Sequence, residues 1–229
     1  MELRAEECEK RYLRSAGGRN WFYAVQPANF ALREGLLTVL MGRSGSGKTT
    51  LLQMLAGLLP PSGGKVLADG RNLYGMNDRE LSRFRNGHIA VIPQGHSAVA
   101  SLTVLQNILL PRTLYGGEAP DEKEARTLME RLGIAQLADV YPSELSGGEL
   151  RRMAIVRAFM QKTEVLLADE PTGDLDDENS LLVLAMLKEC AAEGKAVLLV
   201  THENMAHGFA DVLLDMNAGM LSEQQAQER

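Results

Sequence analysis

Short apolar segments recur along the chain and are separated by segments with helical periodicity. Apolar runs occupy residues 36–41, 89–92, 165–168, 196–200 and 212–214. Runs of this length, closed by Gly, Pro or acidic residues, are typical of strands buried on both faces. Such strands belong to parallel sheets that helices cover on both sides, so the pattern predicts an α/β fold.

Helical patterns fill the intervals between these runs. Residues 49–58 place leucines at helical spacing and end around Gly57, while residues 120–132 repeat apolar positions at i, i+3, i+4 and i+7. Further helices are predicted at about 178–190 and 204–209. Strands and helices therefore alternate, as a doubly covered sheet requires.

The middle of the chain breaks this alternation. It is mainly helix and loop, so we expect a helical subdomain at about 95–159, inserted into a core lobe formed by about 1–93 and 160–229. Within the first part of the core lobe, residues 65–68 and the Asp-Gly pair after them predict a further strand and turn.

Composition and charge narrow the functional classes. The 229 residues are 45% hydrophobic and 24% charged, which are ordinary globular values and argue against disorder. No apolar run approaches the ~18 residues of a membrane span, and the N-terminus lacks a signal-peptide stretch, so we expect a cytoplasmic protein. The net charge of −6 disfavours a nucleic-acid partner, which would require a basic surface. Cys8 and Cys190 form neither a zinc motif nor a disulfide framework.

A glycine-rich loop follows the first apolar run. Residues 42–49 match G-x-x-x-x-G-K-[ST] between a predicted strand and a predicted helix. Glycines let the backbone aim N–H groups at phosphate oxygens, and the helix N-terminus adds partial positive charge. We expect Lys48 to reach the β- and γ-phosphates and the Thr49 hydroxyl to ligate Mg²⁺. The predicted nucleotide-binding residues of this segment are Gly42, Arg43, Ser44, Gly45, Ser46, Gly47, Lys48, Thr49 and Thr50. The loop alone does not separate kinases, GTPases and ATPases.

An acidic pair ends the apolar run at 165–168. Asp169 and Glu170 stand where the carboxyl ends of parallel strands form a ligand crevice. In P-loop proteins an aspartate at this point holds Mg²⁺, commonly through water, and the adjacent glutamate can act as general base on an attacking water. The alternative is a surface turn with two solvated carboxylates, and the presence of the phosphate loop in the same chain disfavours it.

Residues 145–149 read Leu-Ser-Gly-Gly-Glu and precede a helical pattern. In isolation the segment is a helix start, in which Ser146 caps the first turn and Glu149 sits three residues on. That interpretation needs no ligand. It changes once the order of the motifs along the chain is considered.

In that order the motifs resemble those of the ATP-binding cassette (ABC) ATPases, over nearly the whole chain. Leu145, Ser146, Gly147, Gly148 and Glu149 resemble the signature, with glutamate where many members carry glutamine; Gln94 resembles the Q-loop glutamine, Asp174 and Asp176 the D-loop, His202 the switch histidine, and Tyr12 the aromatic residue that stacks on adenine. The resemblance implies a RecA-like P-loop NTPase core with a parallel sheet, an antiparallel β subdomain and an inserted α-helical subdomain.

Two segments are similar to one group of these ATPases. Residues 168–176 and 102–111 resemble the cassettes that serve lipoprotein release, macrolide export and cell-division transporters. The resemblance implies an ATP-hydrolysing subunit that forms a homodimer on binding ATP and powers a separate transmembrane permease. It also implies a peripheral location on the inner face of the cell membrane.

The resemblance assigns roles to residues. The implied catalytic residues are Glu170, His202, Gln94 and Lys48, and the implied Mg²⁺ ligands are Thr49, Gln94 and Asp169, the last through water. The signature residues are implied to act in trans, on the γ-phosphate held by a second copy.

Departures and alternatives remain. The segments that differ from the family pattern are Gly35-Leu36, Gly95-His96, 14–20 and 217–220, and none removes a catalytic residue.

A soluble ABC-type ATPase of DNA repair or translation is the main alternative, although such proteins usually add a second cassette, coiled coils or zinc modules. A P-loop kinase or GTPase would leave 145–149 and His202 without a role, and Glu170 weakens a purely regulatory nucleotide-binding module.

Overall fold

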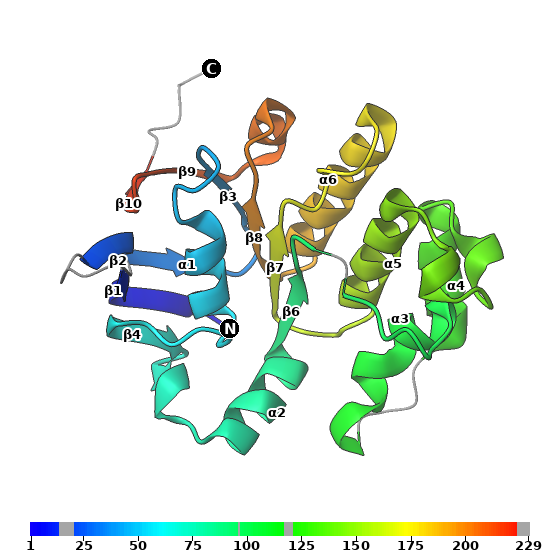
Figure 1. Ribbon diagram of the computed structural model, residues 1–229, viewed down its shortest axis with the longest axis horizontal. Coiled ribbons are helices and arrows are strands. Elements are labelled where there is room, and N and C mark those ends of the chain that lie inside the picture. The colour runs from blue at the N-terminus through cyan, green and yellow to red at the C-terminus, as the bar shows by residue number, and fades with distance from the viewer. Residues whose placement is uncertain (14–20, 96, 117–120, 224–229) are drawn as a thin grey trace.

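Six strands form the central sheet of the computed structural model, which describes residues 1–13, 21–95, 97–116 and 121–223 (Figure 1). The strand order is β10-β9-β3-β8-β7-β6. The parallel strands are β3 (Leu37–Met41), β6 (Ile89–Ile92), β7 (Val165–Asp169), β8 (Ala196–Val200) and β9 (Val212–Asn217), and β10 (Met220–Glu223) returns antiparallel to β9. The α/β fold predicted from the apolar runs is therefore confirmed.

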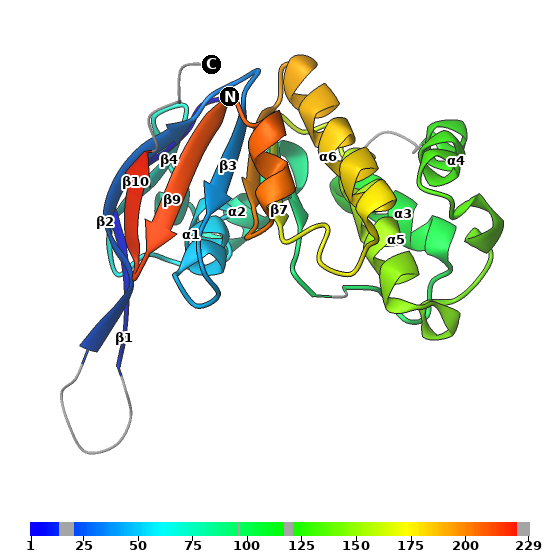
Figure 2. The same ribbon diagram turned by 90° about the horizontal axis from the view of Figure 1, so that it is seen from above.

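Helices lie on both faces of this sheet and beyond its β6 edge (Figures 1 and 2). The α-helices are α1 (Lys48–Leu55), α2 (Asp78–His88), α3 (Val104–Thr113), α4 (Glu122–Arg131), α5 (Gly147–Phe159) and α6 (Asp177–Ala192). Short 3₁₀ helices are η1 (Leu73–Gly75), η2 (Leu114–Gly116), η3 (Ala135–Leu137), η4 (Pro142–Glu144) and η5 (Asn204–Phe209). Among the described residues, no helix is long and apolar enough to cross a membrane.

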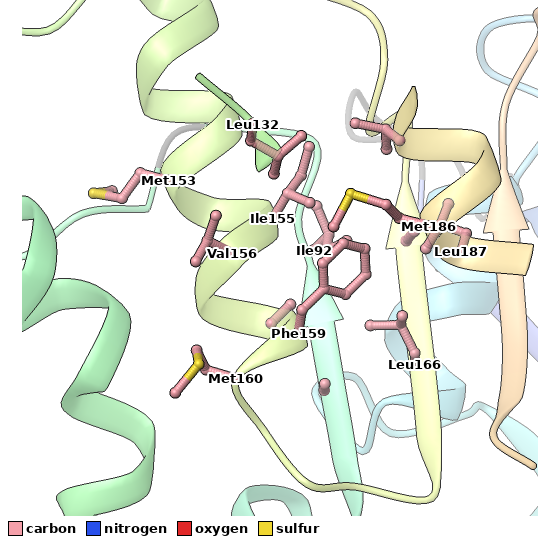
Figure 3. Packing of buried hydrophobic residues seen from close by; sticks show 14 of the residues in the cluster. Ile92, Leu132, Met153, Ile155, Val156, Phe159, Met160, Leu166, Met186 and Leu187 are labelled. Carbon is pink, nitrogen blue, oxygen red and sulfur yellow. The ribbon is translucent and has the colours of Figure 1, made fainter. Parts of the chain in front are cut away.

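Alternate residues of the central strands face two separate hydrophobic clusters. In β7, Leu166 and Ala168 join the cluster that contains α5 and α6, whereas Val165 and Leu167 join the cluster around α1. Figure 3 shows Leu166 beside Phe159 of α5 in the first of these clusters. Every side chain of β3, β7 and β8 is buried, which is why these strands are unbroken apolar runs in the sequence.

The first helix is shorter than its leucine spacing predicts. Residues 49–58 were expected to form it, but α1 ends at Leu55. Gly57 adopts a left-handed φ of +68°, which turns the chain out of the helix. Leu58, expected on the buried face, is 54% exposed, so this part of the prediction was wrong.

A second, antiparallel sheet packs against α1 with the order β2-β1-β4-β5. Its strands are β1 (Leu3–Leu13), β2 (Trp21–Leu32), β4 (Gly63–Ala68) and β5 (Arg71–Asn72). No alternating pattern predicts β1, because a register shift between Ala5 and Cys8, with Glu7 at φ +46°, moves the buried face by one residue. The local pattern predicted β4 and the turn after it, which are confirmed, whereas the sheet as a whole was implied only by the resemblance to ABC ATPases.

Candidate functional site

The phosphate loop is fixed between β3 and α1 by close backbone contacts. Gly47 caps α1 at φ +110°, and a Cβ there would lie 2.0 Å from the Ala24 carbonyl oxygen. A Cβ at Gly42 would lie 2.4 Å from the Met216 carbonyl oxygen. These glycines therefore let the loop sit directly on β2 and β9, and a larger residue would push it away.

Lys48 lies folded back over this loop. Its side chain is only 6% exposed, and Nζ donates hydrogen bonds to the carbonyl oxygens of Gly42 (2.7 Å) and Arg43 (3.0 Å). Nζ also lies 4.0 Å from Oε1 of Glu170. The Ser46 hydroxyl is buried and has no hydrogen-bond partner within the described part of the chain. The loop thus gathers a cation and an unsatisfied hydroxyl, both of which suit a phosphate group.

Asp169 ends β7 directly opposite the start of α1. The Thr49 hydroxyl donates to Oδ1 of Asp169 over 3.2 Å. Asp169 is 2% exposed, and burial raises the pKa of its carboxyl, while the hydrogen bond from Thr49 opposes that shift. A buried carboxylate beside a hydroxyl is the hard-oxygen donor set that Mg²⁺ prefers.

Glu170 and His202 form a polar pair at the ends of adjacent strands. Nδ1 of His202 lies 2.9 and 3.0 Å from the two carboxylate oxygens of Glu170. Glu170 has a left-handed φ of +47°, and its N–H donates to the Val200 carbonyl oxygen (2.8 Å). The side chain of Glu170 is 12% exposed and that of His202 is 64% exposed, so the carboxylate is sheltered and the imidazole faces outward.

The phosphate loop, Lys48, Thr49 and Glu170 line one cavity of about 560 Å³. Its lining residues are Tyr12, Phe22, Tyr23, Ala24, Ser44, Gly45, Ser46, Gly47, Lys48, Thr49, Thr50, Gln94, Glu170, Ala218 and Gly219. The structure therefore brings Tyr12 and Gln94 to the phosphate loop, although they stand far from it in sequence. His202 lies at this edge through its contact with Glu170 and lines a neighbouring hollow with Gly42 and Arg43.

Two parts of the cavity wall were not expected from sequence. Phe22 and Tyr23 of β2 line the cavity, and Phe22 stacks on Tyr12 with ring centroids 5.8 Å apart. Figure 2 shows that β1 and β2 extend as a ribbon beside α1, which explains this placement. The turn between β9 and β10 is tied to the loop because Gly219 N–H donates to the Ser46 carbonyl oxygen (2.9 Å).

The signature segment lies elsewhere on the molecule. The cavity has no lining residue from Leu145–Glu149, all of which the structure describes. Ser146 caps α5: its N–H (2.8 Å) and hydroxyl (2.7 Å) both donate to the Glu149 carboxylate, which lowers the pKa of Glu149. The capping box predicted from sequence is confirmed.

The D-loop packs against the signature segment of the same chain. A Cβ at Gly148 would lie 3.2 Å from the Asp174 carbonyl oxygen. Asp176 caps α6 and accepts from Asn179 N–H (2.8 Å), and its hydrogen bonds with Asn179 lower the pKa of Asp176. Hence Asp174 and Asp176 lie with the signature segment.

One buried side chain received no role from the sequence. Arg151 of α5 donates to backbone carbonyls of Pro93, Gln94 and Glu170, so it contacts two of the segments that carry expected site residues. Nothing local in the sequence could have shown this, because its partners stand 58, 57 and 19 positions away.

The phosphate loop, the acidic end of β7 and the histidine that follows β8 lie at one edge of the central sheet. Together with the fold, they define a P-loop nucleotide-binding ATPase. The family model for ABC transporters matches residues 25–173, and the chain belongs to the ABC transporter family. The ATPase prediction and the resemblance to lipoprotein-release and macrolide-export cassettes are confirmed.

Relatives and solved structures agree with this assignment. The chain is 37% identical to lipoprotein-releasing system ATP-binding protein LolD 1 of Chlorobium luteolum, over 89% of this chain and 90% of that protein. It is 35% identical to the macrolide export ATP-binding/permease protein MacB of Bordetella avium, over 92% of this chain but only 32% of that protein. The dimeric structure of MJ0796, a bacterial ABC transporter cassette, matches with a TM-score of 0.91 and 29% identity, covering 99% of this chain and all of that one.

Proposed function

We propose that this ATPase is the motor subunit of a membrane transporter and that two copies clamp ATP between them. The proposal rests above all on one observation. The phosphate loop, the acidic strand end and the switch histidine meet at one edge of the sheet, whereas the signature segment of the same chain lies away from that cavity. A signature on a second copy can complete the site.

The phosphate loop holds the ATP phosphates in this proposal. Lys48 exchanges its bonds to the loop carbonyls for bonds to the β- and γ-phosphates, and backbone N–H groups of 42–50 surround the remaining oxygens. The room for them is present: a Cβ added at Gly45 would meet no atom within 4 Å. Tyr12, with Phe22 behind it, offers an aromatic face for adenine.

Mg²⁺ accompanies the nucleotide. Thr49, Asp169 and Gln94 supply hydroxyl, carboxylate and amide oxygens at the cavity, with Asp169 acting through water. The described residues contain no group of three His, Cys, Asp or Glu side chains that could hold a metal. Phosphate oxygens and water would complete the coordination of a bound Mg²⁺, which would neutralise charge that develops on the phosphates.

Glu170 and His202 act on the scissile bond. Glu170 orients a water and accepts its proton, because its carboxylate lies at the cavity wall and close to Lys48. His202 holds that carboxylate and donates toward the γ-phosphate as charge builds up. Both groups are prearranged on strand ends, so little reorganisation accompanies the reaction.

The second copy contributes the signature. Ser146 and the N–H groups of Gly147 and Gly148 stand at the N-terminus of α5, where anions bind favourably. The dimers described for MJ0796, one of them bound to ADP and Pi, support a homodimer of this kind. Loss of the γ-phosphate would remove the bridge between the copies and open the dimer.

In this proposal, the closing and opening of the dimer drives a conformational change in a transmembrane permease. LolD is named as the ATP-binding protein of a lipoprotein-releasing system, and MacB joins ATP-binding and permease parts in one protein. We assign the present chain to the inner face of the membrane, beside such a permease, and expect no nucleic-acid partner. Its core lobe would comprise residues 1–93 and 160–229, and its helical subdomain residues 95–159. Co-purification of a membrane protein with the tagged chain tests this part.

Glu170→Gln tests the clamp directly. The variant keeps the size of the side chain and removes the base, so it should bind Mg-ATP, hydrolyse it very slowly and accumulate as a dimer in light scattering. Lys48→Ala in the same background is the control and should remain monomeric because it cannot hold the phosphates. A Glu170→Gln protein that stays monomeric with saturating ATP would contradict the proposal.

A further inference from the structure

One buried arginine joins segments that meet at the catalytic edge. Arg151 lies in α5 and is 2% exposed. Its Nη1 donates to the Pro93 carbonyl oxygen, and its Nη2 donates to the carbonyl oxygens of Gln94 (2.9 Å) and Glu170 (2.7 Å). A single nitrogen thus links the backbone of the Q-loop residue to the backbone of the expected general base.

Packing alone does not account for an arginine at this position. Burial of a guanidinium costs free energy unless hydrogen bonds and nearby charges compensate it. Asp169, Glu170 and Asp174 lie close enough to favour its charge, but Nε is buried without a hydrogen-bond partner in the described part of the chain. An apolar side chain of similar size would fill the space without that cost.

The backbone that Arg151 holds is an unusual one. Glu170 has a left-handed φ of +47°, which a residue with a Cβ adopts only where its surroundings impose it. The Val200 carbonyl oxygen accepts from its N–H, His202 contacts its side chain, and both Arg151 and the Gly173 N–H (3.3 Å) donate to its carbonyl oxygen. The Arg151 bond, at 2.7 Å, is the shorter of the two, so we expect its loss to loosen the backbone that aims the carboxylate.

The loop at the other end of the arginine is exposed. Gln94, Gly95 and Ser97 are exposed residues on the surface between the sheet and the helices. A second arginine of α5, Arg157, holds the same loop by donating to the carbonyl oxygen of Ser97 and to its hydroxyl (2.5 Å). The loop is therefore attached to α5 at two points, and the attachment at Arg151 continues to Glu170.

We propose that Arg151 is a positioning residue that holds the Gln94 loop and the Glu170 backbone in one frame, so that displacement of this loop reorients the general base. The inference rests on the proposed function, which gives Glu170 its role.

Steady-state kinetics test the inference. Arg151→Gln and Arg151→Lys each lose the guanidinium group whose two Nη atoms donate to several backbone carbonyl oxygens. The value of kcat should therefore fall about ten- to a hundredfold, because Glu170 is misplaced. The KM for ATP should change by less than about twofold, because the phosphate loop is untouched. Arg85→Gln is the matched control: Arg85 also anchors a backbone carbonyl, that of Gly57 (2.7 Å), but its hydrogen bonds reach neither the Gln94 loop nor Glu170, so this variant should keep kcat.

A double-variant cycle separates positioning from general loss of structure. In the Glu170→Gln background, Arg151→Gln should neither lower the residual turnover further nor weaken the ATP-induced dimer, because the group it positions is already gone. An unchanged kcat in the single variants, or additive losses in the double variant, would overturn the inference.

Folding is checked by thermal melting, and Arg151→Lys carries the test if Arg151→Gln does not fold. Failure of the proposed function has a different signature. If Glu170→Gln itself retained full turnover, the role of Glu170 would be wrong whatever the Arg151 variants did.

Discussion

The ionisation of Asp169 depends on how deeply its carboxyl is buried. Its carboxyl is almost fully buried at the end of β7, and this burial raises its pKa, against opposing contributions from the Thr49 hydrogen bond and from Lys48 and Arg151. The charged form is therefore less favoured than in an exposed aspartate. A bound Mg²⁺, held through water, would favour the charged carboxylate, so metal binding and protonation oppose each other at Asp169.

Mg²⁺ affinity in the presence of ATP should consequently fall as the solution is acidified, starting at a higher pH than an exposed aspartate would give. The sign follows from the raised pKa: protonation of Asp169 sets in earlier as pH falls, and only the ionised carboxylate serves the metal. Titration calorimetry with Mg²⁺ at a series of pH values measures the shift.

Asp169→Asn provides the comparison for that titration. The amide keeps the shape of the side chain but does not titrate, so its weaker Mg²⁺ binding should vary less with pH than that of the unchanged chain. Identical pH profiles for the two proteins would show that another group governs the metal.

At the scale of elements, the predictable features are those that the chain builds from consecutive residues. The phosphate loop, the Asp169-Glu170 strand end and the Ser146 cap each combine a motif with the strand or helix beside it. Features built across the chain escape local patterns. The bulge at Glu7 hides the alternation of β1, and the bonds of Arg151 reach residues up to 58 positions away. Such contacts depend on tertiary packing, which no periodicity encodes.

Helix α5 begins with the signature segment, so in the proposed dimer Ser146 would both cap this helix and contact the nucleotide of the second copy. Ser146→Arg removes the cap and places a long cation at the expected contact with the second copy. It should cost about 1 kcal/mol of folding stability, leave ATP binding largely intact, and abolish dimerisation and turnover. Equilibrium binding of ATP, light scattering and turnover assays measure the three effects separately.

Helix α3 supplies the matched control, because Thr103 and Gln106 form the same capping box away from the cavity. Thr103→Arg should lose a similar amount of stability, by about 1 kcal/mol, and still dimerise. Equal loss of dimer in both variants would mean that helix stability, and not a contact with nucleotide, explains the effect of Ser146→Arg.

At the scale of the whole molecule, the proposed dimer requires each chain to carry two incomplete halves of a site. The cavity at the phosphate loop and the signature beside the D-loop are separate surfaces. Head-to-tail pairing with two-fold symmetry would match each half to its complement and produce two equal sites. Substitutions in the two halves should therefore complement one another between copies, which a site contained within one chain would not allow.

Mixing Lys48→Ala with Ser146→Arg protein tests this arrangement. Each variant alone should be inactive, because neither forms the ATP-bridged dimer with a second copy of itself. In a mixed dimer, the phosphate loop of the Ser146→Arg copy meets the intact signature of the Lys48→Ala copy, while the other site carries both defects. If the sites turn over independently and one intact ATP bridge holds the mixed dimer together, an equimolar mixture should recover at most about half of the normal ATPase activity, since only mixed dimers form and each has one intact site. Phosphate release measured across mixing ratios should peak near equal amounts. A mixture that forms dimers yet stays inactive at every ratio would exclude independent shared sites.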